Sequence, residues 1–253
     1  MPFYAVTFGP KHTYNDWCLI PKSRPVISPP TPKTLYVDIP GADGVLDLTN
    51  ALTDDVKYEN RKITFEFTVL DARNRWSNIY SDILDYLHGQ SMKIILDEDP
   101  TYYYMGRVQV NEWKSDKRTS TITIEAYVEP YKMNVDSTLD DWLWDPFNFE
   151  TGLIQNYSNM EFDSVNDPSK KFHCVVQGRK RIIPTITVTT EDGADIGLYI
   201  YTPSGWKFVI YQSGVPKKDY SIVWPEGTWD VQADAGNTAN KGTITVDYRM
   251  GRL

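Results

Sequence analysis

The sequence has little of what metal sites and disulfide frameworks are built from. Its 253 residues include two cysteines, Cys18 and Cys174, and three histidines, His12, His88 and His173. No C-x-x-C or H-x-x-x-H pair is present, and these are the spacings that structural zinc sites use. We therefore expect two buried free thiols, no metal centre and no cofactor.

Long apolar runs and a surplus of basic residues are also missing. No stretch approaches the roughly 20 apolar residues that span a bilayer, and residues 1–16 lack the charged and apolar regions of a signal peptide. The formal net charge is −8, and a negative surface repels a polyanion. We expect no membrane insertion, no secretion signal and no nucleic acid binding through surface charge.

Motifs for phosphate binding and catalysis are absent as well. "GADG" (residues 41–44) lacks the third glycine of a dinucleotide loop and the Gly-Lys-Ser/Thr of a P-loop. Asp43 and Asp47 are not followed by the glutamate of an EF-hand, so a glycine-bearing turn is expected. The adjacent acids Asp97–Asp99 are expected to solvate a turn, since glycoside hydrolysis needs two carboxyls facing across a cleft. With no nucleophile motif beside the histidines, we predict no catalytic residues and no enzyme.

The sequence does contain segments with the residue pattern of β-strands. Residues 61–70, "RKITFEFTVL", alternate apolar and polar side chains as a half-buried strand does. Residues 97–130 hold two β-rich segments separated by the polar turn "KSDKRTS", which predicts a hairpin. Residues 21–40 contain six prolines, and these favour an extended arm or loop along a sheet edge over a central strand.

One segment, residues 72–89, has helical periodicity. Its apolar residues recur at offsets of three and four, and Gly89 follows as a C-terminal stop. We expect this helix to pack its apolar stripe on a sheet; the stripe consists of Trp76, Ile79, Tyr80, Ile83, Leu84 and Leu87.

A domain boundary is expected near residue 133. Residues 134–150 carry five acids and no base, and short β segments with regular Gly, Pro and Asn punctuation follow. That punctuation predicts a sandwich or jelly roll. The predicted fold is mostly β with one α-helix: an N-terminal β-sandwich or α+β domain (1–133) and a C-terminal β-sandwich (134–253).

Two short basic runs and three tryptophans allow a second interpretation. "KSDKR" (114–118) and "GRKR" (178–181) are expected to be solvated loops, or else a salt-sensitive contact with an acidic protein surface. Trp206, Trp224 and Trp229 are expected to pack in or around the sandwich core. The alternative is that they form a platform on which a sugar ring stacks.

Seven segments and one helix, in this order, resemble one family. The N-terminal part contains "VDIPGADGVLDLT", "YENRKITFEFTV", one helix, "YYYMGRVQV" and a hairpin that ends in "TITIEAYVEPYK". The C-terminal part contains "LWDPFNFE", "RIIPTITV" and "GTITVDYRMGRL". Together they resemble the distal tail protein (Dit) family of siphophages that infect Gram-positive bacteria, over nearly the whole chain.

The resemblance implies a structural role in the virion. Members of this family form a hexameric ring at the tail tip, between the tail-tube protein and the tail-associated fibre or lysin protein. Their galectin-like C-terminal domains project outward and, in some phages, hold receptor-binding or baseplate proteins. The resemblance thus implies a homo-hexamer in the virion tail tip that is assembled in the host cytoplasm, with an N-terminal ring-forming domain.

Two other classes of function stay open. The jelly-roll half also fits a carbohydrate-binding module of a surface adhesion protein, which a glycan array would reveal. A cell-wall-degrading enzyme is disfavoured by the missing catalytic constellation, and loss of turbidity of host cell walls would test for one.

Overall fold

The computed structural model of the chain describes residues 4–51, 53–139, 147–148, 153–154, 157–234 and 241–253. It contains two compact units, Met1–Lys132 with Leu253, and Met133–Arg252. Both units are built mainly from antiparallel strands, so the predicted mostly β fold class is confirmed. In the described residues, no helix is both long enough and apolar enough to cross a membrane.

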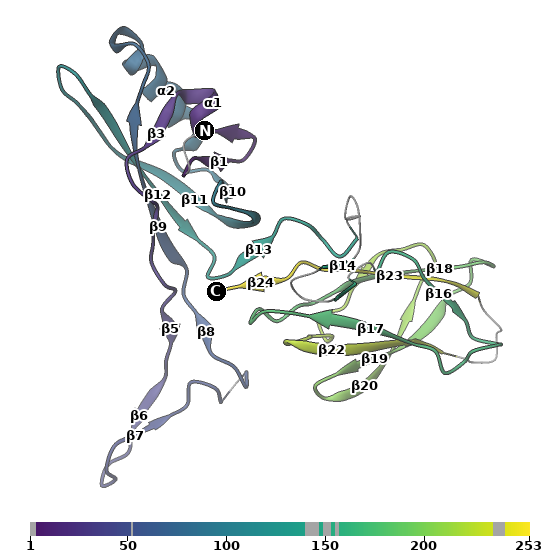
Figure 1. Cartoon of the computed structure of the whole chain (residues 1–253). Helices are drawn as coiled ribbons and strands as arrows, with labels where there is room; N and C mark the ends of the chain where they lie inside the picture. Colours follow the sequence, from purple (N-terminus) through teal and green to yellow (C-terminus); the bar gives the residue numbers. More distant parts are fainter. Residues whose placement is uncertain (1–3, 52, 140–146, 149–152, 155–156, 235–240) are drawn as a thin grey trace. The chain divides into compact units, whose positions relative to one another are not determined.

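The N-terminal unit is organised on one sheet with the strand order β2-β1-β10-β11-β12-β9-β3 (Figure 1). Its strands are β1 (Val6–Phe8), β2 (Lys11–His12), β3 (Leu19–Pro21), β9 (Arg61–Val69), β10 (Ser91–Leu96), β11 (Asp99–Ser115) and β12 (Ser120–Val128). Alternate residues of β9 are buried, including Ile63, Phe65 and Phe67. The half-buried strand and the β11–β12 hairpin predicted from the sequence are therefore confirmed.

The predicted helix is present as the short 3-10 turn η1 (Arg73–Arg75) followed by α2 (Trp76–Leu87). Its stripe joins the core that β9, β11 and β12 form: Trp76, Ile79, Ile83 and Leu87 are buried, and Tyr80 and Leu84 are partly buried. The chain reverses at Gly89, whose φ of +76° is a left-handed conformation that glycine adopts most easily. A second helix, α1 (Thr13–Trp17), was not predicted because five residues are too few for periodicity to show.

The proline-rich region has two parts. In the first, β3 and β4 (Val26–Ile27) pair with the edge of β9, as expected of an extended segment. In the second, β5 (Pro32–Lys33) pairs with β8 (Lys57–Tyr58), and β6 (Tyr36–Asp38) pairs with β7 (Val45–Asp47). Figure 1 shows residues 28–51 and 53–60 leaving the sheet of this unit as a two-stranded projection, which we call the arm.

The C-terminal unit contains two four-stranded sheets with one shared core. The first has the order β16-β23-β18-β21 and the second β17-β22-β19-β20. The strands are β16 (Met160–Asp163), β17 (Lys171–Val176), β18 (Thr185–Thr190), β19 (Ile196–Thr202), β20 (Gly205–Tyr211), β21 (Lys217–Lys218), β22 (Gly227–Ala233) and β23 (Lys241–Asp247). Buried residues of both sheets form a single cluster, for example Val188 and Ile244 with Leu198 and Val231. This arrangement is a β-sandwich.

Two small ladders complete the C-terminal unit. β14 (Phe147–Asn148) pairs with β15 (Leu153–Ile154), and β13 (Lys132–Asn134) pairs with β24 (Gly251–Arg252). The amide of Asn134 donates a hydrogen bond to the carbonyl of Met250 at 2.9 Å. The first and last segments of the unit are therefore held together.

Candidate interaction surfaces

The glycine-bearing segment "GADG" is the turn at the tip of the arm, between β6 and β7. The Ala42 amide donates to the Ile39 carbonyl at 3.1 Å, and Gly41 and Gly44 have φ angles of +86° and +81°. A Cβ at either glycine would meet nothing within 4 Å, so backbone conformation is what requires glycine here. The segment continues into a strand, and the predicted structural turn is confirmed.

The three consecutive acids lie where β10 turns into β11, as predicted, but each has its own partner. The pairs are Asp97 Oδ2 with His12 Nε2 at 3.1 Å, Glu98 Oε2 with Arg24 Nε at 3.6 Å, and Asp99 Oδ2 with Lys132 Nζ at 2.5 Å. The prediction of a merely solvated turn was therefore incomplete. These contacts connect the turn to three separate segments of the N-terminal unit, and sequence spacing carries no sign of them.

The three histidines have structural partners. His12 Nδ1 accepts hydrogen bonds at 3.2 Å from the first amides of α1, which caps that helix. His88 Nδ1 accepts from the Val110 amide at 3.3 Å. His173 Nδ1 lies 2.6 Å from Asp230 Oδ1 on the solvent face of the C-terminal sandwich. Each imidazole thus positions a neighbouring segment.

The two basic runs lie beside turns. "KSDKR" begins on the last two residues of β11 and continues into the exposed turn before β12, whereas "GRKR" follows β17 and is mostly half-buried. The expected solvated loop therefore holds only for the first run. In "KSDKR", Asp116 Oδ1 accepts hydrogen bonds at 2.6 Å from the amides of Thr119 and Arg118, and these bonds lower the pKa of the carboxyl. In "GRKR", the amide of Lys180 donates to the Gly251 carbonyl at 3.3 Å. Both runs have local structural roles.

The three C-terminal tryptophans divide between core and surface. Trp224 and Trp229 are buried, and their indole N–H groups donate to the carbonyls of Tyr201 and Pro225 at 3.0 and 2.8 Å. Core packing is confirmed for these two. Trp206 is 44% exposed, so it belongs to a surface.

Both cysteines are free thiols, as predicted, but only Cys174 is buried, so the predicted burial is wrong for Cys18. Cys174 is fully buried in the sandwich, and burial raises the pKa of its thiol to about 12 because a thiolate is disfavoured away from water. Cys18 is exposed at the C-terminal end of α1, with a φ of +52°. The two thiols therefore differ strongly in accessibility.

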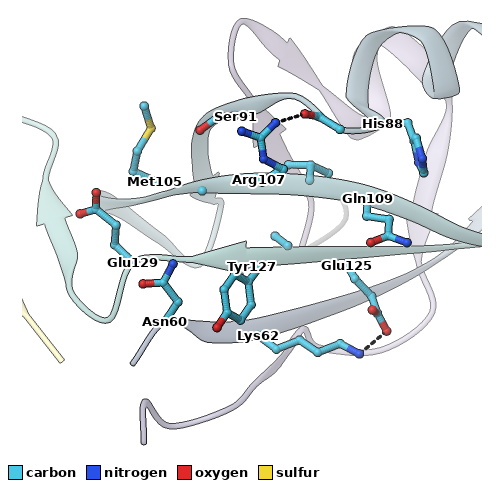
Figure 2. Close-up of a pocket in the computed structure, with 14 residues that line it drawn as sticks. Asn60, Lys62, His88, Ser91, Met105, Arg107, Gln109, Glu125, Tyr127 and Glu129 are labelled. Atoms are coloured by element: carbon cyan, nitrogen blue, oxygen red, sulfur yellow. Dashed lines mark hydrogen bonds and ion pairs between the residues drawn. The ribbon is translucent and has the colours of Figure 1, made fainter. Parts of the chain in front are cut away.

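A groove of about 700 Å³ lies on the solvent face of the N-terminal sheet (Figure 2). Lys62 Nζ lies 2.5 Å from Glu125 Oε1, and this hydrogen bond lowers the pKa of Glu125. The guanidinium of Arg107 donates to the carbonyl of Gly89; Figure 2 shows both interactions. The charged groups of the groove are thus paired with neighbours on the same surface.

The chemistry available in this groove is hydrogen bonding. Tyr127 and Met105 are exposed beside the charged pairs, and the described residues contain no group of three His, Cys, Asp or Glu side chains placed to hold a metal ion. Gly106 lets β11 approach β12 closely here, since a Cβ would lie 2.3 Å from the Tyr127 carbonyl oxygen. A mixed polar and apolar surface of this kind suits contact with another protein.

The solvent face of β19 and β20 is aromatic, and it was not predicted from the sequence. Its members are Tyr199 and Tyr201 of β19 and Trp206, Phe208 and Ile210 of β20, all exposed. Tyr199 contacts Phe208 and Tyr201 contacts Trp206, with ring centroids 5.0 and 5.2 Å apart. Alternation in "LYIYTPSGWKFVIY" could have indicated a two-faced hairpin, but it cannot tell which face the protein covers.

The sequence matches no protein-family model and no curated protein. The fold is similar to that in the crystal structure of SPP1 Dit (gp 19.1) protein, which is described as a paradigm of the hub adsorption apparatus in phages infecting Gram-positive bacteria. The TM-score is 0.62 at 13% sequence identity, and the alignment covers 97% of this chain and 98% of the other. At this identity the likeness establishes the fold.

Proposed function

We propose that this chain is a structural hub protein of a phage tail tip, which forms a hexameric ring through its N-terminal unit. The observation that carries the proposal is the extent of the fold likeness, which runs through both units and leaves almost no part of either chain unmatched. A likeness confined to the sandwich would support only a common β module. Agreement over the whole two-unit order supports a shared role by fold-level analogy.

The exposure of the arm supports assembly through this unit. Leu35, Tyr36, Ile39, Val45 and Leu46 are exposed, and none of the arm's described residues belongs to the core of the unit. An isolated two-stranded hairpin is marginally stable in water, and exposed apolar clusters commonly mark interfaces. We infer that the arm packs on a neighbouring copy in the ring.

In this role the N-terminal unit connects the tail-tube protein to the tail-associated fibre or lysin protein. The C-terminal sandwich, proposed to be galectin-like, holds receptor-binding or baseplate proteins. The protein would thus reside in the virion tail tip and act in host attachment without catalysis. The acids of the β10–β11 turn and the histidines support a role without catalysis, because each already has a structural partner.

Negative-stain electron microscopy of the purified full chain, together with its mass in solution, tests the proposal. We expect rings with a central channel, formed by the chain alone or on mixing with its tail-tube partner. Leu46→Asp places a charge in the arm and should abolish the rings, whereas Asp43→Ala at the arm tip should preserve them. A chain that stays monomeric even with the tail-tube protein would contradict the proposal.

One observation favours a second candidate function, a carbohydrate-binding module. Trp206 and Tyr201 are exposed aromatic rings of the kind on which a sugar stacks. Against it, Lys171 Nζ lies 5.1 Å from the centroid of the Trp206 ring and therefore already occupies a position over it. A glycan array with the wild-type chain and Trp206→Ala separates the two functions.

A further inference from the structure

The C-terminal sandwich has four sheet edges among its described residues, and three of them are protected. β16 has four residues and β21 has two. β17 is longer, but it presents Lys171 and His173 to solvent. Short strands and charged side chains are common devices that prevent another strand from pairing with an edge.

The fourth edge, β20, is the least protected, with one charged side chain, Lys207. It is seven residues long and contains no proline. Trp206, Phe208 and Ile210 are 44, 50 and 58% exposed along one face. A long apolar edge is a template for strand addition, so it needs a covering partner.

The backbone of β20 is oriented for such a partner. The Asp234 amide donates to the Gly197 carbonyl at 2.8 Å. The backbone N–H and C=O groups of odd-numbered residues of β19 therefore point toward β22. Hydrogen-bonding direction alternates along an antiparallel strand, so even-numbered residues of β19 bond to β20. Their partners in the register are Lys207, Val209 and Tyr211.

The amides and carbonyls of Trp206, Phe208 and Ile210 therefore point to the free edge. A separate contact agrees with this assignment, because Lys217 Nζ donates to the Ile210 carbonyl at 3.0 Å from outside the sheet. Trp206 and Phe208 thus offer amides, carbonyls and apolar side chains. Ile210 offers its amide and its apolar side chain beside the carbonyl that Lys217 contacts. An added strand could use the backbone groups and the side chains at once.

Charge around the edge indicates what the added strand should carry. Lys207 lies on β20 itself, with its Nζ 2.5 Å from the Ser221 carbonyl, and Lys217 reaches the Ile210 end of the strand. Lys171 lies over the Trp206 ring at the other end. Acidic side chains flanking an apolar segment would complement these ammonium groups.

A sugar fits this face less well than a strand does. Tyr201 contacts the Trp206 ring, and Lys171 lies over it. The Phe208 ring lies against Gly197, where a Cβ would be 2.3 Å from its edge carbons. The Trp206 ring is thus partly covered. Phe208 and Ile210 present apolar surface, but their side chains have no hydrogen-bonding group for a sugar.

We propose that β20 is the docking edge for a second protein, which adds an extended segment as a fifth strand of the β17-β22-β19-β20 sheet. The segment has apolar side chains at alternate positions and acidic side chains at its ends. The inference deepens the proposed hub function, since it places an attached protein on a defined surface of the C-terminal unit. The peptide-binding test depends on the C-terminal unit, whereas ring formation depends on the arm. The docking proposal and the hub proposal can therefore fail separately.

The experiment uses the full chain and a displayed library of nine-residue segments with alternating apolar positions and acidic ends. A selected peptide is synthesised and its Kd measured for wild type, Phe208→Lys and Thr228→Lys. Thr228 is an exposed position of the internal strand β22 in the same sheet, so it is a matched control. We expect Phe208→Lys to weaken binding by about tenfold or more and the control to change it by about twofold or less.

N-methylation of the peptide backbone gives a second readout. Methyl groups on one alternate set of amides should abolish binding, and on the other set should leave it intact, since only one set faces β20. A selection without binders, equal Kd values for both variants or equal binding by both methylated peptides would overturn the proposal. It would also be overturned if Phe208→Lys altered the oligomeric state, or if Trp206→Ala abolished binding on a glycan array, because the occupant would then be a second copy or a sugar.

Discussion

β9 and the arm are consecutive in the chain and similarly rich in apolar residues, yet their surroundings are opposite. Every second residue of β9 is buried, whereas all residues of β6 and β7 are exposed. β9 has β12 on one side and β3 and β4 on the other; β6 and β7 have only each other. An apolar pattern therefore predicts which residues need burial, but it does not indicate whether the same chain buries them.

This contrast separates residues that stabilise the unit from residues that serve assembly. Removing a buried side chain costs its transfer free energy plus the cavity left behind. Altering an exposed side chain of the arm leaves the folded unit intact. Melting and assembly measurements should therefore respond to different substitutions.

The largest effect is expected from the buried stripe of α2. Ile83 is fully buried, and Ile83→Ala should lower the free energy of unfolding by about 2–5 kcal/mol. That is a large share of the roughly 5–15 kcal/mol of a typical domain. Asp82→Ala, on the exposed face of the helix, should change little. Thermal denaturation of both variants checks this, and an unchanged melt for Ile83→Ala would indicate that the stripe is a docking groove.

A smaller loss is expected where β11 approaches β12. Gly106→Ala would place a Cβ 2.3 Å from the Tyr127 carbonyl oxygen, and the two strands would have to separate. Overpacking of this kind typically costs about 1–3 kcal/mol. Urea denaturation measures the loss, and Gly44→Ala in the arm tests whether the two regions differ. In Gly44→Ala the free-energy cost comes from the positive φ alone, and it is confined to the arm. We therefore expect no change in the cooperative unfolding of the rest of the unit.

The two thiols differ in exposure, and this difference can be measured without any substitution. A thiol reagent at pH 8 should label Cys18 in the native chain and reach Cys174 only on unfolding. The Cys174 pKa is raised to about 12, so the native state keeps this proton while the unfolded thiol ionises near pH 9. The contribution of this group to stability is therefore fully present below about pH 9 and is lost as pH rises toward 12. Rapid labelling of both thiols in the native state would contradict the burial.

The smallest effect on melting is expected in the arm. Leu46→Asp should leave the melting temperature within about 1 °C of wild type, because exposed substitutions away from the core usually change stability by under about 0.5 kcal/mol. The same variant should lose ring assembly, as described above. Differential scanning calorimetry gives the melt. A clear drop would show that the arm stabilises its own unit, and the contrast with β9 would fail.

Strong local periodicity made much of the fold predictable. The stripe from Trp76 to Leu87 and the alternation in β9 each specify an element and its buried face. The polar turn between β11 and β12 specified their pairing as neighbours in sequence. Elements of this kind are determined by residues close to one another along the chain.

Partners far apart in sequence were not predictable. The contact between Asp97 and His12, like that between Asp99 and Lys132, depends on the order of strands in the sheet. The open face of β20 was missed for a related reason: Trp206 and Trp224 are the same residue type in similar β-rich sequence, and one is exposed while the other is buried. Only the position of the second sheet decides between them.

The strand order of the N-terminal unit also bears on its synthesis. β1, near the start of the chain, pairs with β10. β9 is synthesised well before its partner β12, whose last residue is Val128. A nascent chain growing at about 5–20 residues per second therefore carries Phe65 and Phe67 uncovered for several seconds before the sheet can close. During that interval the ribosome-bound chain exposes the apolar side chains of β9. We therefore expect the nascent chain to bind the host's nascent-chain chaperones.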